Sequence, residues 1–288
     1  MDIKTLRPRT LWQQPSGPAY GPLTELLLIL TMVTGLVDAV SILALGRVFV
    51  ANMTGNIVFA GFAITGAPGF SLSASLFALA GFLAGASAGG AMTTRAGHDR
   101  ALHLRAATVT ELALVAAALV IAAVSGDAAV SHGTLGAASG HPFSAGIADA
   151  LAFLLAVAMG IQNSMARKLA IPDLTTTVLT MTLTGIGADA RAGRRGQAML
   201  VRRLLVVGTM LAGGILGAWL VLNVSAVSAL ALAAGLLAIT AATATRAALR
   251  PGEWRPVSPP APPAAAPTTA SQRRADHHDG TVDGAFGE

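Results

Sequence analysis

The stretch VFVANMTGNIVFAGFAITG, residues 48–66, decides the fold that this sequence predicts. It is apolar and long enough to cross a membrane, yet polar and flexible residues interrupt it between Asn52 and Asn56. A second interrupted segment, near residues 174–190, reads LTTTVLTMTLTGIGAD and contains six threonines. Whether these two segments cross the bilayer determines the topology of the whole chain.

The composition indicates an integral membrane protein. Of the 288 residues, 53% are hydrophobic and only 11% are charged, whereas a soluble domain carries about 25% charged residues. The formal charge of +5 does not predict a nucleic-acid partner, because the basic residues lie between the apolar runs, as the positive-inside rule expects. The absence of cysteine excludes disulfides, thiolate metal sites and a cysteine nucleophile.

Six further apolar runs are long enough to cross about 30 Å of hydrocarbon. They lie near residues 23–45, 72–93, 106–125, 144–166, 204–222 and 224–245. We therefore expect a transmembrane domain over residues 21–247, preceded by a flexible lead at 1–20. Residues 248–288 are rich in proline and alanine, a composition that predicts a disordered tail.

The transmembrane domain contains an internal repeat, with halves at about 23–125 and 144–245. GLVDA at 35–39 aligns with GIQNS at 160–164, so Asp38 falls on Asn163. ANMTGN at 51–56 then lies over TVLTMT at 177–182, and LAG at 83–85 over LAG at 211–213. Three matches in the same order, with polar groups on polar groups, predict a duplication.

The arginines distinguish two topologies. One cluster is Arg95, Arg100 and Arg105, the other is Arg191, Arg194, Arg195, Arg202 and Arg203, and residues 126–143 contain no Lys or Arg. If all eight segments cross, the halves are parallel and the clusters lie on opposite sides. If the two interrupted segments are re-entrant or broken, six spans remain, the halves are inverted, and both clusters and both termini face the cytoplasm. The positive-inside rule favours six crossings, and eight stays open as the alternative.

Two stretches carry a resemblance to a known family. GLVDAVSILALGRVFVANMTGNIVFAG at 35–61 and NSMARKLAIPDLTTTVLTMTLTG at 163–185 are similar to the YoaK-type bacterial membrane proteins, a domain of unknown function (number 1275), over about residues 23–245. The resemblance implies a six-span integral membrane protein with no established biochemical activity. One departure is Thr180-Met181-Thr182, which stands where a second Thr-Gly-Asn-like turn is expected.

The polar residues inside the apolar runs are the candidate substrate or ion pathway. Asp38 lies well inside the first span, where a carboxylate costs about 2.5–3.5 kcal/mol. It is interpreted either as a proton- or cation-coupling group or as a structural clamp on the segment of its own repeat. The other candidates are Asn52, Thr54, Asn56, Gln162, Asn163, Thr176, Thr177 and Thr180. In inverted-repeat transporters, discontinuous helices from both halves meet near the midplane, but the same residue types also hydrogen-bond helices together.

Glu111 is either a second coupling carboxylate or a residue that reaches the interface or pairs with Arg105. Small residues recur on one face of two spans, a pattern typical of close helix packing: Gly81, Gly85 and Gly89 in one, and Gly213 and Gly217 in the other. No catalytic or phosphate-binding motif is present in the sequence, so we expect no enzymatic activity, no metal and no cofactor.

The sequence therefore predicts an all-α protein of the bacterial inner membrane, whose partner is the lipid bilayer. Its expected function is secondary transport or export of a small solute, with proton coupling left open. The alternative is a non-transporting scaffold or interaction protein, in which duplication and polar residues are only structural. Assembly of the chain into a homo-oligomer is left open.

Overall fold

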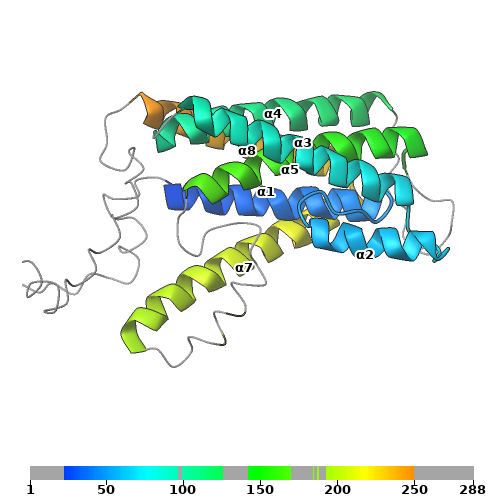
Figure 1. The fold of residues 1–288 in the computed structure, drawn as a ribbon, viewed down its shortest axis with the longest axis horizontal. Helices are drawn as coiled ribbons and strands as arrows, with labels where there is room; N and C mark the ends of the chain where they lie inside the picture. Colours follow the sequence, from blue (N-terminus) through cyan, green and yellow to red (C-terminus); the bar gives the residue numbers. More distant parts are fainter. Residues whose placement is uncertain are drawn as a thin grey trace, which may run out of the picture. The chain divides into compact units, whose positions relative to one another are not determined.

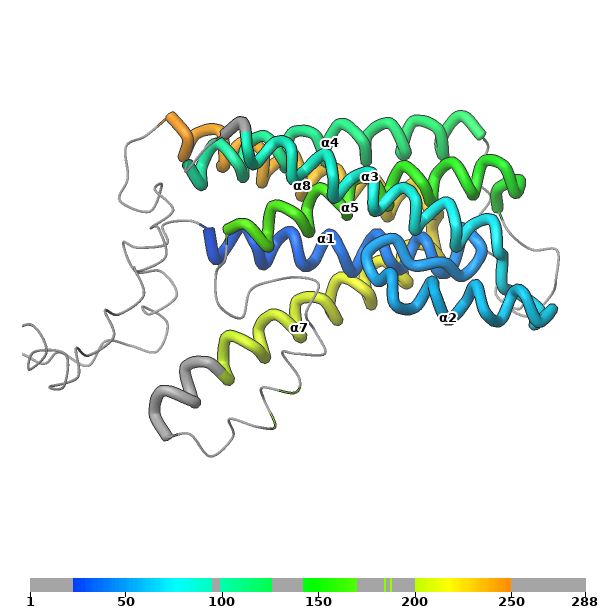
Figure 2. The backbone as a smooth tube through the Cα atoms, in the orientation of Figure 1, coloured from blue at the N-terminus to red at the C-terminus, as the bar shows by residue number. Residues whose placement is uncertain are grey.

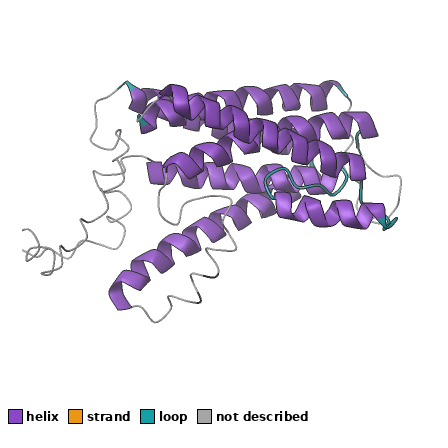
Figure 3. Cartoon of the chain, in the orientation of Figure 1, coloured by secondary structure: helices purple, strands orange, loops and turns teal. Residues whose placement is uncertain are grey.

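The computed structural model describes residues 23–96, 99–125, 142–169, 184, 187 and 193–249, with the backbone alone at 95–96 and 193–199. These residues form seven helices and no β-strand (Figures 1 and 3). The predicted lead at 1–20 lies outside the described residues, as does the predicted tail from residue 250 onward. The second interrupted segment also lies outside them, apart from Thr184 and Gly187.

Six of the helices are long and apolar enough to span a membrane, which confirms the number of long spans predicted from hydropathy. They are α1 (Leu23–Ala44), α3 (Leu72–Ala96), α4 (Arg100–Val124), α5 (Ala145–Leu169), α7 (Gly193–Asn223) and α8 (Ala226–Ala248). The seventh, α2 (Met53–Ile64), has 12 residues, or about 18 Å of helix. It is therefore too short to cross the hydrocarbon alone, although the apolar stretch that contains it is not.

Local sequence signals account for several helix ends. Asp99 caps α4, because its carboxylate accepts hydrogen bonds from the backbone N–H groups of Ala101 and Leu102 at 2.9 and 3.3 Å. Ser225 caps α8 by accepting from Ser228 N–H at 3.1 Å, which starts a new helix directly after α7. These caps satisfy donors that the first turn of a helix leaves free.

The long helices alternate in direction along the chain. In Figures 1 and 2, α1, α4 and α7 run one way and α3, α5 and α8 run the other. One end of the bundle, which we call the basic end, carries Arg100, Arg167, Lys168 and Arg246 at helix termini. The opposite end contains α2 and the turn between α7 and α8, and we call it the α2 end.

Two helix pairs dominate the packing, α3 on α5 and α1 on α7, while α4 packs on α8 and α5. Helix α1 is the most enclosed, with Leu30, Leu36 and Val37 fully buried. The outer faces carry large apolar side chains instead, such as Leu83, Leu211 and Ile215, each more than 60% exposed. Such faces suit lipid as the surrounding solvent and are rare on soluble proteins.

Candidate functional site

The site is organised around the buried polar side chains of α1. Thr31 and Thr34 donate their hydroxyls to the carbonyls of Leu27 and Leu30, at 2.8 and 3.0 Å, within their own helix. Asp38 has no hydroxyl to turn back in this way. Its carboxylate reaches instead to a different part of the chain.

Asp38 holds the non-helical segment between α1 and α2, which we call the hinge loop (residues 45–52). The backbone N–H groups of Val50 and Ala51 both donate to Oδ1 of Asp38, each at 3.2 Å. Asp38 is 6% exposed, and it lies six residues before the end of α1, or about 9 Å along the axis. The hinge loop therefore turns back along α1 to the depth of Asp38 before α2 begins.

The reversal that starts the hinge loop is made by two consecutive residues with left-handed backbone. Gly46 has a φ of 92° and Arg47 a φ of 57°. Glycine adopts such angles without steric cost, whereas a residue with a side chain adopts them infrequently. The chain can therefore turn back sharply at this point instead of continuing α1.

Asn56 fixes the hinge loop from the other side. Its Oδ1 accepts from the backbone N–H of Phe49 at 2.8 Å, and its Nδ2 donates to the carbonyl of Phe49 at 2.6 Å. Asn56 is fully buried, the one residue of α2 in that class. The two candidates Asp38 and Asn56 thus bind consecutive backbone groups of one loop, which satisfies buried polar groups that would otherwise be costly.

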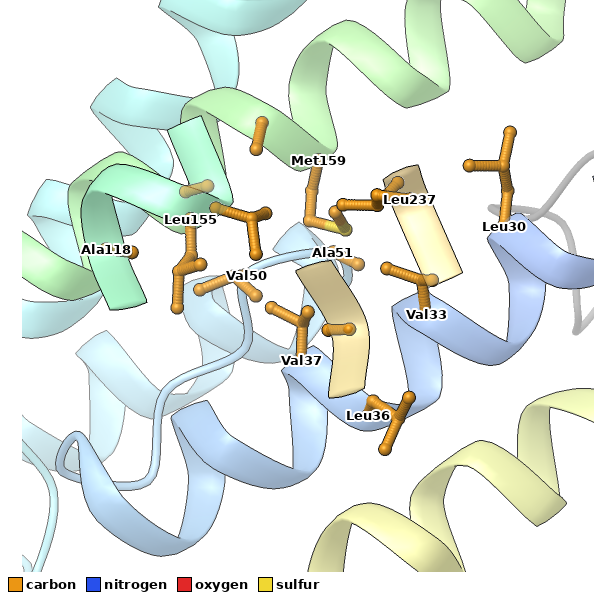
Figure 4. Packing of buried hydrophobic residues seen from close by; sticks show 14 of the residues in the cluster. Leu30, Val33, Leu36, Val37, Val50, Ala51, Ala118, Leu155, Met159 and Leu237 are labelled. Carbon is orange, nitrogen blue, oxygen red and sulfur yellow. The ribbon is translucent and has the colours of Figure 1, made fainter. Parts of the chain in front are cut away.

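The tip of the hinge loop lies among apolar side chains of the long helices. Figure 4 shows Val50 and Ala51 among residues of α1, α4, α5 and α8, including Val37, Leu155 and Leu237. Val50 is fully buried and Ala51 is 7% exposed. In this conformation the centre of the bundle is closed by packed side chains around a polar clamp.

An aromatic cluster that sequence reasoning missed supports the hinge loop and α2. The ring of Phe49 stacks on Phe59 with 5.5 Å between centroids, and Phe59 packs on Phe70 at 5.0 Å. Gly55 leaves room for this arrangement, since a Cβ there would lie 2.6 Å from Cδ2 of Phe49. The signal in the sequence is the recurrence of phenylalanine around the interrupted segment.

Gln162 ties α5 to α1 one turn away from Asp38. Its Nε2 donates to the hydroxyl of Thr34 at 2.8 Å, while its buried Oε1 has no hydrogen-bond partner within the described part of the chain. Thr34 was not among the predicted residues, although its position four residues before Asp38 places it on the same helix face. Asn163 is half-buried and donates to the carbonyl of Met159 in its own helix at 3.0 Å.

The remaining predicted residues are placed differently. Asn52 and Thr54 are exposed, so of the Asn-Met-Thr-Gly-Asn turn only Asn56 contributes a buried polar side chain. Thr176, Thr177 and Thr180 lie outside the described residues. In the ranges that are described, no three His, Asp or Glu side chains converge as they would to bind a metal.

The glycines form two close helix contacts within the chain. A Cβ on Gly81, Gly85 or Gly89 of α3 would meet the backbone of α5, and one on Gly213 or Gly217 of α7 would meet the backbone of α1. Conversely, Gly160 of α5 faces α3, and Gly35 of α1 faces α7. Small residues let the two backbones of each pair approach closely.

Comparison with known proteins identifies the family. The family described as "Protein of unknown function (DUF1275)" matches residues 26–243. The chain belongs to this family. It is also 36% identical over 165 residues to a protein named "UPF0700 transmembrane protein YoaK" from Bacillus subtilis (strain 168), a match that covers 57% of this chain and 65% of that relative. No solved structure matches the chain significantly.

The family match confirms the resemblance seen in the sequence and includes the whole candidate site. Asp38, the hinge loop and Asn56 all lie inside the matched region of this DUF1275 chain. Together with the six long apolar helices, the relationship to a transmembrane protein identifies it as a multi-pass membrane protein of an uncharacterised family.

Proposed function

We propose that this DUF1275 protein is a secondary transporter or exporter of a small solute, in which the hinge loop and α2 form a re-entrant gate. The observation that carries the proposal is the contact of Asp38 with the backbone N–H groups of Val50 and Ala51. Non-helical backbone at membrane depth is tolerated where it is buried in protein or lines a cavity. An acid that is hydrogen-bonded to such backbone couples a change in its own charge to movement of the loop.

The proposed mechanism starts from the strength of these two hydrogen bonds. Bonds to an ionised acceptor are roughly twice as strong as neutral ones. When a proton or a cation neutralises Asp38, the hold on Val50 and Ala51 weakens and the hinge loop can leave the space between α1, α5 and α8. Movement of the loop would open a path from the α2 end, and loss of the proton would close it. In secondary transporters, alternating access is achieved by rocking or gating of one part of the fold against another.

We further propose that the fold is an inverted repeat. Helices α1, α3 and α4 of the first half correspond to α5, α7 and α8 of the second, and corresponding helices run in opposite directions (Figure 1). The glycine contacts support this, because Gly35 meets α7 as Gly160 meets α3. The positive-inside rule puts the basic end in the cytoplasm, and the α2 end then faces outward in the inner membrane.

The test is flux through membrane vesicles that contain the protein. Vesicles with a trapped pH-sensitive dye are screened with classes of small solutes for proton movement that depends on the protein. We expect Asp38→Asn to abolish that movement while insertion is retained, and Asn163→Leu to leave most of it. Undiminished proton-coupled flux in Asp38→Asn would exclude Asp38 as the coupling group.

A scaffold without transport is the second candidate, and the packed loop tip favours it. Val50 and Ala51 are enclosed by apolar side chains, as in a purely structural clamp. In that case Asp38→Asn alters stability only, and no solute in the screen moves protons in the presence of the intact protein.

A further inference from the structure

A second buried acid lies in the bundle, outside the hinge-loop clamp. Glu111 of α4 is fully buried, and neither of its carboxyl oxygens has a hydrogen-bond partner in the described part of the chain. It lies 11 residues after Arg100, where α4 begins, or about 16 Å along the helix axis. Both ends of α4 are therefore distant from its carboxyl group.

Among the described side chains, no opposite charge faces Glu111 from the helices that pack on α4. The buried faces of α5 and α8 carry no ionisable side chain. The ionisable residues of α5 are Asp149 near its start and Arg167 and Lys168 in its last turn, and α8 has Arg246 in its last turn. On α3 the one ionisable residue, Arg95, lies next to the helix end.

The ionisable neighbours on α4 itself do not pair with Glu111 either. Arg105 is exposed, six residues away and therefore on another side of the helix. His103 is buried two turns away, and its Nε2 contacts the carbonyl of Thr93 at 2.9 Å. The ion pair with Arg105 that the sequence allowed is thus not formed.

The contrast with Asp38 decides the protonation state. Asp38 accepts two backbone N–H donors, which suit an ionised carboxylate, whereas Glu111 receives none from the residues that the structure describes. An ionised carboxylate buried without donor or counter-charge costs several kcal/mol, and such a group becomes neutral instead. A metal ion in its place would need several oxygen ligands, and within the described residues no group of acidic or histidine side chains surrounds Glu111.

We propose that Glu111 is a proton-binding site of the membrane core, uncharged at neutral pH in this conformation and independent of Asp38. It releases its proton only when α4 moves against α5 and α8 and admits water or a cation. This inference stands without the proposed transport. If transport occurs, Glu111 supplies a second proton-binding group to the cycle.

Infrared spectroscopy of the purified full-length protein at pH 7 tests the proposal. A protonated carboxyl has a C=O stretch separate from the bands of ionised carboxylates and of the backbone. We expect such a band in the intact protein, its loss in Glu111→Gln, and its retention in Asp38→Asn. Glu25→Gln is the matched control, because Glu25 is exposed in the first turn of α1 and its removal should leave the band unchanged.

Two outcomes would overturn the proposal. One is a spectrum of the intact protein at pH 7 without a protonated-carboxyl band, and the other is a band that survives in Glu111→Gln. Neither result depends on solute movement. Failure here is therefore distinguishable from failure of the proposed function, which the flux of Asp38→Asn measures.

Discussion

Replacement of Asp38 by leucine should release the hinge loop. The substitution keeps the branched shape of the side chain, with two larger methyl groups in place of the carboxyl oxygens, and removes the acceptor of two buried N–H groups, those of Val50 and Ala51. Each buried donor without a partner costs about 1–3 kcal/mol, so the closed loop should lose about 2–6 kcal/mol. Since about 1.4 kcal/mol is a factor of ten, the low end of that range makes opening of the loop about thirtyfold more frequent.

Hydrogen–deuterium exchange of peptides that cover residues 45–52 measures this opening, because exchange of a protected amide reports the free energy of local opening. The matched control is Thr31→Val. Thr31 is buried on the same helix, and its hydroxyl donates to the carbonyl of Leu27 rather than to the hinge loop, so its loss should leave exchange in the hinge loop unchanged. Asp38→Asn keeps one carbonyl oxygen as an acceptor, so its rate of exchange in the hinge loop should lie between the rates of Asp38→Leu and Thr31→Val.

Equal exchange rates in Asp38→Leu and in the intact protein would refute the reasoning, provided that peptides from α1 and α5 retain their protection. That result would mean that apolar packing alone holds Val50 and Ala51 in place. The carboxylate would then not control the position of the loop.

Two further predictions concern single contacts, and each variant is paired with a control that carries the same substitution at another position. Gly85→Ala should lower the melting temperature in detergent, because its Cβ would lie 2.8 Å from a backbone carbon of α5 and overpacking costs about 1–3 kcal/mol. Gly214 has open space around it, so Gly214→Ala should be neutral or slightly stabilising. An equal fall in melting temperature for the two variants would contradict the close-contact interpretation. Asn56→Ala should destabilise by about 1–3 kcal/mol, since it removes two part-buried hydrogen bonds to Phe49, each with a net contribution of about 0.5–1.5 kcal/mol. Asn52 is exposed, so Asn52→Ala should change stability by less than about 0.5 kcal/mol. Similar thermal unfolding of the two variants would rule out the clamp.

The six long helices could be predicted from the sequence, because a bilayer sets both their length and their apolarity. The break in the stretch at residues 48–66 could be predicted for the same reason, since Asn52 and Asn56 are costly inside hydrocarbon. Asp38 was identified as a rare acid in an apolar run. Each of these inferences compares the polarity of single residues with the hydrocarbon that surrounds them.

The partners of those residues could not be predicted. Asp38 binds backbone N–H groups, and every residue except proline carries one, so the sequence contains no mark of Val50 and Ala51 as donors. Asn52 and Asn56 are the same residue type, four positions apart, yet only Asn56 is buried. The start of α2 at Met53 and the direction of that helix decide between them.

The surroundings of Glu111 could not be predicted from the sequence either. An ion pair with Arg105 was one interpretation of Glu111, but the six-residue spacing on a continuous α4 places the two on different sides, with Arg105 outward and Glu111 inward. Burial without a partner depends on which faces of α5 and α8 meet α4, and hydropathy alone carries no information on that. The counterpart of the hinge loop in the second half, with Thr176, Thr177 and Thr180, stays a prediction.

The most direct test of the six-crossing topology is the accessibility of single cysteines in intact cells, for which the cysteine-free chain is a clean background. Thr65 follows α2 and Thr94 lies near the end of α3, and both are exposed. Val224, which is external under either topology, is the positive control, and Leu249, which is internal under either, is the negative control. With a re-entrant hinge loop, a membrane-impermeant thiol reagent labels Thr65→Cys and spares Thr94→Cys. The reverse pattern would mean that the segment at residues 48–66 crosses the bilayer and that the halves are parallel.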